Sequence, residues 1–219
     1  RRMRKAFEYA DLNVDERLTS YFYWGNPSRL EGLLSAESRE SIKGRHVSEP
    51  LLHALGDIPI DTPALNRMLF LESKFFLPDH NLNYTDKMSM AAGIEVRVPL
   101  LDPDLVSLAA RLPVEFKQKG SEGKWIFKKA MEKYLPKEII YRPKMGFGAP
   151  LRSWLHNELK PQMMELLSKE SIERRGIFES LAVDALIKQD AIGKIDATYS
   201  IFSMMCIEMW CRKFVDSET

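Results

Sequence analysis

Apolar residues recur at intervals of three or four along most of the chain, which is the period of an amphipathic α-helix. The run over residues 62–77 is the clearest, with Thr62 as its N-cap and Pro63 at its first helical position. We therefore expect a chain that is mainly helical. The predicted helices cover residues 14–24, 37–55, 62–77, 83–92, 102–113, 123–135, 158–168, 181–189 and 196–215.

Two of these helices have clear boundary residues. Asp102 precedes a proline and should cap the helix that follows, with Leu105 and Leu108 on its inward face. The helix over residues 123–135 should end before Pro136, because proline cannot continue a helix comfortably.

Strand patterning is limited to one short segment, residues 94–100. Its apolar residues alternate with polar or proline positions, the period of two of an extended chain. A single strand cannot make a sheet, and no internal linker is long enough to divide the chain. The pattern therefore predicts an all-α, compact body with one extended insertion.

The composition is that of a globular protein. Of the 219 residues, 45% are apolar and 29% are charged, which excludes a disordered tail, a collagen-like fibre or a low-complexity linker. The 32 Lys and Arg residues nearly balance the 31 Asp and Glu residues. This balance argues against a nucleic-acid partner. If the protein binds an anion, a few individually positioned Lys or Arg side chains should neutralise it.

The cysteines and the chain start point to a reducing compartment. Cys206 and Cys211 are badly spaced for a disulfide on a helix, so we expect two buried, reduced thiols. No apolar stretch is long enough for a membrane helix, and no secretory signal follows the basic start. These features favour the cytoplasm. The chain also lacks an initiator methionine and is expected to be a piece of something longer.

Two short segments place charges in unusual settings. Asp86, beside Lys87, lies near the predicted start of a helix, where its carboxylate can accept backbone N–H bonds without any further role. Glu95 and Arg97 should project from the polar side of the extended segment. Charges in so apolar a run are costly unless they are paired or used, so a buried structural brace and a functional pair both remain open.

A third segment, residues 141–150, holds two prolines and two glycines within eight residues and should be a shaped loop. Such a loop can bring the Lys144 ammonium close to a phosphate, while Gly146 and Gly148 let the backbone approach a ligand. The spacing is not that of a Walker A loop, and a surface turn remains the alternative. Scattered histidines and the lack of a C-x-x-C motif argue against a metal site in this chain.

Together these segments resemble the C-terminal part of the synthetase domain of glutamine-dependent asparagine synthetases, which belong to the PP-loop ATP pyrophosphatase superfamily. The resemblance covers about residues 65–217. Four motifs carry it in order: Leu77-Pro78-Asp79, Asp86-Lys87-Met88-Ser89-Met90-Ala91, Ile94-Glu95-Val96-Arg97-Val98-Pro99-Leu100-Leu101-Asp102 and Arg142-Pro143-Lys144-Met145-Gly146-Phe147-Gly148-Ala149-Pro150.

The resemblance implies ATP-dependent amide formation. Aspartate would be activated as an aspartyl-adenylate and then attacked by ammonia from glutamine, giving the amide and AMP. Lys144 matches the family lysine that meets phosphate and developing charge. The residues that match the supporting positions are Asp86, Lys87, Glu95, Arg97, Arg142, Gly146 and Gly148.

The resemblance also implies that residues 1–219 are the helical C-terminal portion of a larger α/β adenine-nucleotide α-hydrolase-like domain. The S-G-G-x-D-S pyrophosphate loop, a second magnesium-binding segment and the glutaminase domain are not in this sequence. ATP and Mg²⁺ would be bound mainly by residues upstream, so the isolated chain should be inactive. It should also expose an apolar face where the sheet would pack.

The implied partners are small molecules (aspartate, ATP and glutamine-derived ammonia) and the N-terminal domains of the same protein, with a homodimer left open and no nucleic acid or membrane. Tyr84 stands where relatives often have a basic residue, which leaves the acceptor open. Two alternatives therefore stay: a ligase of the same family for another carboxylate, and a non-catalytic helical scaffold.

Overall fold

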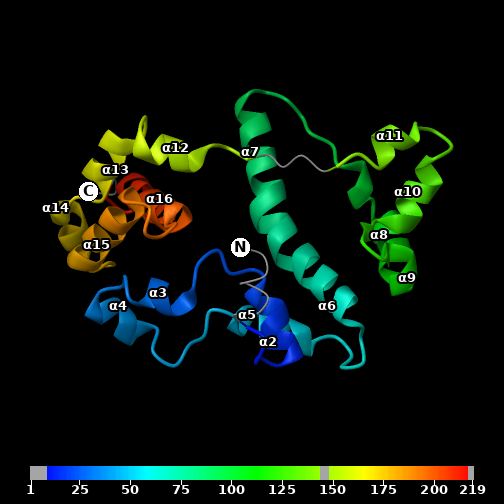
Figure 1. Cartoon of the computed structure of the whole chain (residues 1–219), viewed down its shortest axis with the longest axis horizontal. Coiled ribbons are helices and arrows are strands. Elements are labelled where there is room, and N and C mark those ends of the chain that lie inside the picture. Colours follow the sequence, from blue (N-terminus) through cyan, green and yellow to red (C-terminus); the bar gives the residue numbers. More distant parts are fainter. Residues whose placement is uncertain (1–8, 144–147, 217–219) are drawn as a thin grey trace. The chain divides into compact units, whose positions relative to one another are not determined.

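The computed structural model describes residues 9–143 and 148–216, and these are mostly helical, as predicted (Figure 1). The chain divides into two units. Unit 1 comprises Arg1–Tyr21 and Ser48–Met145, and unit 2 comprises Phe22–Val47 and Gly146–Thr219. The expectation of one undivided body was therefore wrong. Each unit is built from two separate stretches of the chain, with boundaries near residues 21, 47 and 145. Composition along the sequence gives no sign of these boundaries.

Three helices of unit 1 pack around a small core: α2 (Val14–Ser20), α5 (Glu49–Gly56) and α6 (Ala64–Leu71). Asn13 caps α2 by accepting a hydrogen bond from the Glu16 backbone N–H at 3.0 Å. The apolar residues buried in this core are Leu18, Ala54, Leu55 and Leu71. The predicted helix over residues 37–55 is two helices, because α4 (Ala36–Ser41) lies in unit 2 and α5 lies in unit 1.

Helix α6 continues without a break into a π-helical segment, η1 (Glu72–Leu82), and then into α7 (Asn83–Ala91) (Figure 1). The two predicted helices, 62–77 and 83–92, are thus one rod. Pro78 lies inside η1, and since proline has no N–H and obstructs the preceding turn, a wider turn accommodates it.

The expected strand over residues 94–100 is absent. The described chain forms only a 3₁₀ turn there, η2 (Pro99–Leu101), and its one sheet is the two-residue pair β1 (Gln118–Lys119) and β2 (Glu122–Gly123). The alternation of Ile94 to Leu100 finds no neighbouring strand among the described residues, and an extended segment without a partner makes no ladder.

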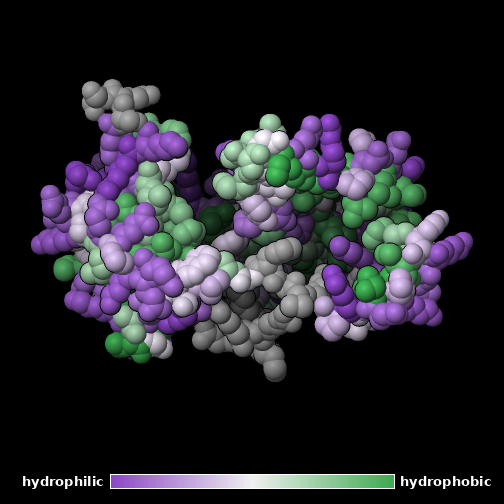
Figure 2. Space-filling view, turned by 90° about the horizontal axis from the view of Figure 1, so that it is seen from above, coloured by the Kyte–Doolittle hydropathy of each residue, from purple (hydrophilic) through white to green (hydrophobic). Residues whose placement is uncertain are grey.

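Helix α8 (Pro103–Arg111) begins as predicted, because the Asp102 carboxylate accepts hydrogen bonds from two backbone N–H groups at 3.0 and 3.1 Å. Its inward face was predicted wrongly: Leu105 is 39% exposed and Leu108 is 52% exposed. No residue from 83 to 140 is buried. This range also contains α9 (Val114–Lys117), α10 (Trp125–Met131) and α11 (Lys137–Ile140). Apolar side chains thus reach the surface in this part of unit 1, as Figure 2 illustrates.

Unit 2 holds the larger core. Its helices are α3 (Pro27–Glu31), α4, α12 (Leu151–His156), α13 (Lys160–Leu166), α14 (Lys169–Arg175), α15 (Ser180–Ala191) and α16 (Thr198–Phe214). One cluster contains the buried residues Leu33, Leu155, Met163, Leu166, Leu167, Ile172, Val183, Leu186, Ala197, Ile201, Met204 and Met205. Both cysteines on α16 are free, as predicted, but only Cys211 is buried and Cys206 is exposed.

Candidate functional site

Asp86 and Lys87 lie in the first turn of α7, and both are exposed. The predicted capping role of Asp86 was wrong. Because α7 continues from η1, its first N–H groups have helical partners in the preceding turn, and no side chain caps it. The Asp86 backbone carbonyl accepts a hydrogen bond from the Ser89 hydroxyl at 3.0 Å. The Asp86 carboxylate and the Lys87 ammonium therefore face solvent.

Glu95 and Arg97 form the predicted ion pair, with 2.6 Å between a guanidinium nitrogen and a carboxylate oxygen. The predicted burial is wrong, since the side chain of Glu95 is 66% exposed and that of Arg97 is 85% exposed. An ion pair in water contributes about 0–1 kcal/mol to stability. The pair is therefore a weak brace, and both groups are accessible to a ligand.

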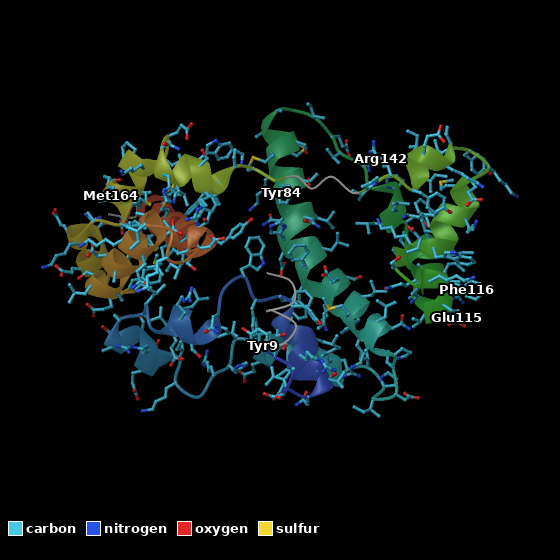
Figure 3. The ribbon with its side chains drawn as sticks, viewed as in Figure 1. Tyr9, Tyr84, Glu115, Phe116, Arg142 and Met164 are labelled. Carbon is cyan, nitrogen blue, oxygen red and sulfur yellow. The ribbon has the colours of Figure 1, made fainter. Side chains whose placement is uncertain are left out.

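The glycine- and proline-containing loop is described only at its two ends. Arg142 is exposed at the end of α11 (Figure 3). Gly148 is also exposed, and a Cβ placed there would meet open space. Lys144 and Gly146, two of the residues predicted for the site, lie outside the described residues.

A hydrogen-bonded cluster lies directly before Arg142, and sequence reasoning missed it. The Tyr141 hydroxyl donates to Glu132 Oε1 at 2.6 Å, and the Lys129 ammonium donates to the same oxygen at 2.8 Å. The hydrogen bond from Lys129, followed by that from Tyr141, lowers the pKa of Glu132. The same bonds to Glu132 raise the pKa of Tyr141 and of Lys129. We call these three residues the Glu132 cluster.

The segment that contains the Glu132 cluster carries an excess of positive charge. The Lys128 ammonium pairs with Glu122 and lies 5.3 Å from the centre of the Tyr141 ring, within cation–π range. Between residues 122 and 142 the chain carries six cations, Lys124, Lys128, Lys129, Lys133, Lys137 and Arg142, against three carboxylates, Glu122, Glu132 and Glu138. This local excess of three positive charges can attract an anion, although the whole chain is almost neutral.

The described residues predicted for the site come from two parts of unit 1, except Gly148, which belongs to unit 2. Asp86, Lys87, Glu95 and Arg97 lie on α7 and the segment after it, whereas Arg142 follows α11. Within residues 9–143 and 148–216, no recorded hydrogen bond or ion pair joins the first group to Arg142. The same residues contain no group of three His, Cys, Asp or Glu side chains suited to a metal ion. No helix in the described part of the chain could cross a membrane.

Comparison with known proteins decides the family. The model of the family described as asparagine synthase matches residues 4–212. The chain belongs to the asparagine synthase family. The resemblance inferred from the four sequence motifs is therefore confirmed.

The relatives that it matches are longer proteins. A putative glutamine-hydrolysing asparagine synthetase of Mycobacterium tuberculosis is 27% identical, and the match covers 98% of this chain and 32% of that protein. Asparagine synthetase 1 of Bacillus subtilis, also glutamine-hydrolysing, is 27% identical over 67% of this chain and 23% of its own length. A Penicillium rubens protein named amidase chyE is 28% identical over 59% of this chain and 21% of its own length.

This asparagine synthase family chain thus spans about a quarter to a third of the length of the first two relatives. No solved structure matches it.

Proposed function

We propose that this chain is part of a glutamine-dependent asparagine synthetase and contributes to the ATP-dependent formation of an amide from aspartate. In this reaction a side-chain carboxylate oxygen attacks the α-phosphorus of ATP, and pyrophosphate leaves. Ammonia from glutamine then attacks the aspartyl-adenylate carbonyl, and AMP leaves as the amide forms. The observation that carries the proposal is the ordered series of motifs between residues 77 and 150, in a chain that the asparagine synthase family model matches over residues 4–212.

The residues of this chain would act by electrostatics and positioning. Phosphate carries the negative charge that must be offset as pyrophosphate leaves, and a preorganised cation lowers the barrier for that step. Lys144 is the proposed catalytic cation, and Arg142 belongs to the positively charged segment that leads to it. We assign Asp86, Lys87, Glu95 and Arg97 supporting roles in the walls of the site, without an acid or base step.

ATP is a substrate in this proposal, and Mg²⁺ would accompany its phosphates. The described residues offer cations for a phosphate but no cluster of carboxylates for a metal ion. We therefore derive no step through Mg²⁺ from these residues. Among the carboxylates predicted for the site, Glu95 already forms an ion pair, with Arg97.

The test is the Lys144→Ala variant of the full-length protein that contains this chain. We expect synthesis, measured as aspartate-dependent release of AMP and pyrophosphate, to fall by about two to three orders of magnitude, because one such donor contributes about 2.7–4 kcal/mol to a barrier. Glutamine hydrolysis should continue at its normal rate. Lys194→Ala is the matched control, since Lys194 is an exposed lysine outside the positively charged segment. Near-normal synthesis by Lys144→Ala would show that the lysine has been assigned wrongly.

The same assay separates the alternative functions. AMP release with another carboxylate, and not with aspartate, would identify a ligase of the same family with a different acceptor. No AMP release with any carboxylate in a panel, despite a folded protein, would favour the helical scaffold. The isolated 219-residue chain should release no AMP, and turnover by it would contradict the proposal that ATP is bound mainly by other parts of the protein.

A further inference from the structure

We propose that Glu132 is a positioning residue of the synthetase reaction: through its hydrogen bond with Tyr141 it holds the segment that ends at Arg142. The proposal rests on the proposed function, because it assigns the Arg142 segment to the phosphate side of that reaction. Glu132 itself would touch no substrate. It would act on Arg142 through its hydrogen bond with Tyr141 and the peptide bond between Tyr141 and Arg142.

The geometry of the α10–α11 hairpin supports this role. Glu132 is the C-cap residue of α10, and Tyr141 is the C-cap residue of α11. Their hydrogen bond of 2.6 Å joins the ends of the two helices across eight intervening residues. The Tyr141 backbone N–H also donates to the Lys137 carbonyl at 2.9 Å. Both the main chain and the side chain of Tyr141 are thus held, immediately before Arg142.

A positioning role can be told from a simple charge effect. Glu132 is an anion in the positively charged segment 122–142, where Lys129 donates to it and Lys128 lies over the Tyr141 ring. If charge alone mattered, removing this carboxylate would make the segment more positive and would improve its attraction for phosphate. If position matters, removing it releases Tyr141 and impairs the reaction. The two explanations therefore predict opposite changes.

The experiment compares five variants of the full-length protein: Tyr141→Phe, Glu132→Ala, the double variant of these two changes, Glu132→Gln and the control Tyr134→Phe. Tyr134 is a tyrosine of the same hairpin that is 75% exposed. Glu132→Ala and Glu132→Gln carry the same charge, but only Gln keeps an oxygen that can accept from Tyr141. The measurements are kcat and KM for ATP in aspartate-dependent AMP release, the rate of glutamine hydrolysis and the thermal unfolding midpoint.

We expect Tyr141→Phe and Glu132→Ala each to lower kcat by about tenfold, below the roughly 100-fold loss that a 1 Å misplacement can cause. Glu132→Gln should recover part of the loss. The Tyr141→Phe and Glu132→Ala double variant should be no worse than the poorer single variant, because both changes break one interaction. Glutamine hydrolysis and the unfolding midpoint should match those of Tyr134→Phe.

Three results would overturn the proposal. These are a kcat for Tyr141→Phe within about twofold of the control, a higher kcat/KM for Glu132→Ala than for the unmodified enzyme, and a parallel fall in glutamine hydrolysis that indicates misfolding. Hydrogen exchange of the residue-141 amide, which donates to the Lys137 carbonyl, gives a readout that needs no activity, and Tyr141→Phe should accelerate it. If the unmodified protein releases no AMP, the proposed function fails, whereas an unchanged exchange rate at residue 141 would reject the positioning role itself.

Discussion

Glu208 is a charged residue on the buried face of α16 and is only 5% exposed. Its carboxylate accepts hydrogen bonds from the guanidinium groups of Arg175 and Arg212, both at 2.8 Å, and from the Ser171 hydroxyl at 3.1 Å. Burial by itself raises the pKa of Glu208, but these hydrogen bonds outweigh it and lower the pKa to about 2. The carboxylate therefore joins α14 to α16 as an anion.

Replacing this carboxylate should be costly. In Glu208→Gln the buried ends of two arginines lose their counter-charge, and breaking a buried ion pair from one side typically costs about 3–5 kcal/mol. We expect a loss near the lower end, about 3 kcal/mol in the free energy of unfolding by urea, because Arg212 is partly exposed. Glu173→Gln is the control. Its exposed pair with Lys169 should contribute at most about 0.5 kcal/mol, and an equal loss in both variants would refute the argument.

The same carboxylate predicts how stability changes with acid. The folded pKa of Glu208, about 2, lies below its ordinary value of 4.5, so the unfolded chain binds the proton first as the pH falls. The stabilisation is complete above pH 4.5 and is lost as the pH approaches 2, by about 3 kcal/mol at most. Urea unfolding at about pH 6, above this window, and at about pH 4, 3 and 2, within it, should show the decline. The decline should be shallower in Glu208→Gln, and identical slopes would exclude Glu208 as its source.

For single residues, sequence reasoning identified hydrogen-bond partners that are close in sequence and missed those that are distant. The Asp102 cap was predictable because its acceptor lies two or three residues from its donors. Glu208 was visible as a charge within an apolar segment, but Arg175 is 33 residues away, and nothing in the pattern pairs them. The Glu132 cluster was missed for the same reason, since Tyr141 lies nine residues beyond Glu132 on a different helix.

At the scale of elements, the positions of many helices were predictable, but the short helices α3, α12 and α14 were missed and helix environment was not predictable. The apolar period located α8, α13, α15 and α16, because helical hydrogen bonds are local. The period cannot say whether a second surface covers the apolar face, so Leu105 and Leu108 were wrongly placed inside. The segment over residues 94–100 failed in the same way, because a strand depends on a neighbour that local alternation does not supply.

A glycine at the end of α14 provides a test of element boundaries. Gly176 caps α14 in the left-handed region, with φ of 73°, and its N–H donates to the Ile172 carbonyl at 3.0 Å. Gly176→Ala should lower the free energy of unfolding by about 1 kcal/mol, since an L side chain strains this conformation even in open space. The matched change is Gly56→Ala at the end of α5, where an added Cβ also meets nothing but φ is not left-handed. It should stabilise the protein by about 0.5–1 kcal/mol. Equal effects of the two changes in urea unfolding would contradict this assignment.

For the whole molecule, buried apolar residues are unevenly divided. Unit 2 contains one cluster of twelve buried hydrophobic residues, whereas residues 83–140 of unit 1 contain no buried residue. Apolar side chains are exposed along α8, at Leu105, Val106 and Leu108. Apolar periodicity within a helix does not predict this difference, because burial depends on contacts between segments that are distant in sequence.

This uneven burial predicts an uneven pattern of amide hydrogen exchange. Local opening costs least where few apolar contacts are broken and the backbone is close to solvent. The amides of α15 and α16, around Val183 and Ile201, should therefore exchange most slowly, and those of α8 and α10 should exchange orders of magnitude faster.

Substitutions should show the same difference. Ile201→Ala should lower the free energy of unfolding by about 2–5 kcal/mol, and Leu108→Ala, from an exposed site, by about 0.5 kcal/mol or less. Equal protection of α8 and α16, together with a large loss in Leu108→Ala, would mean that another surface covers α8 in solution. Repeating the exchange at two protein concentrations would then show whether that surface belongs to a second copy, because only its protection would rise with concentration.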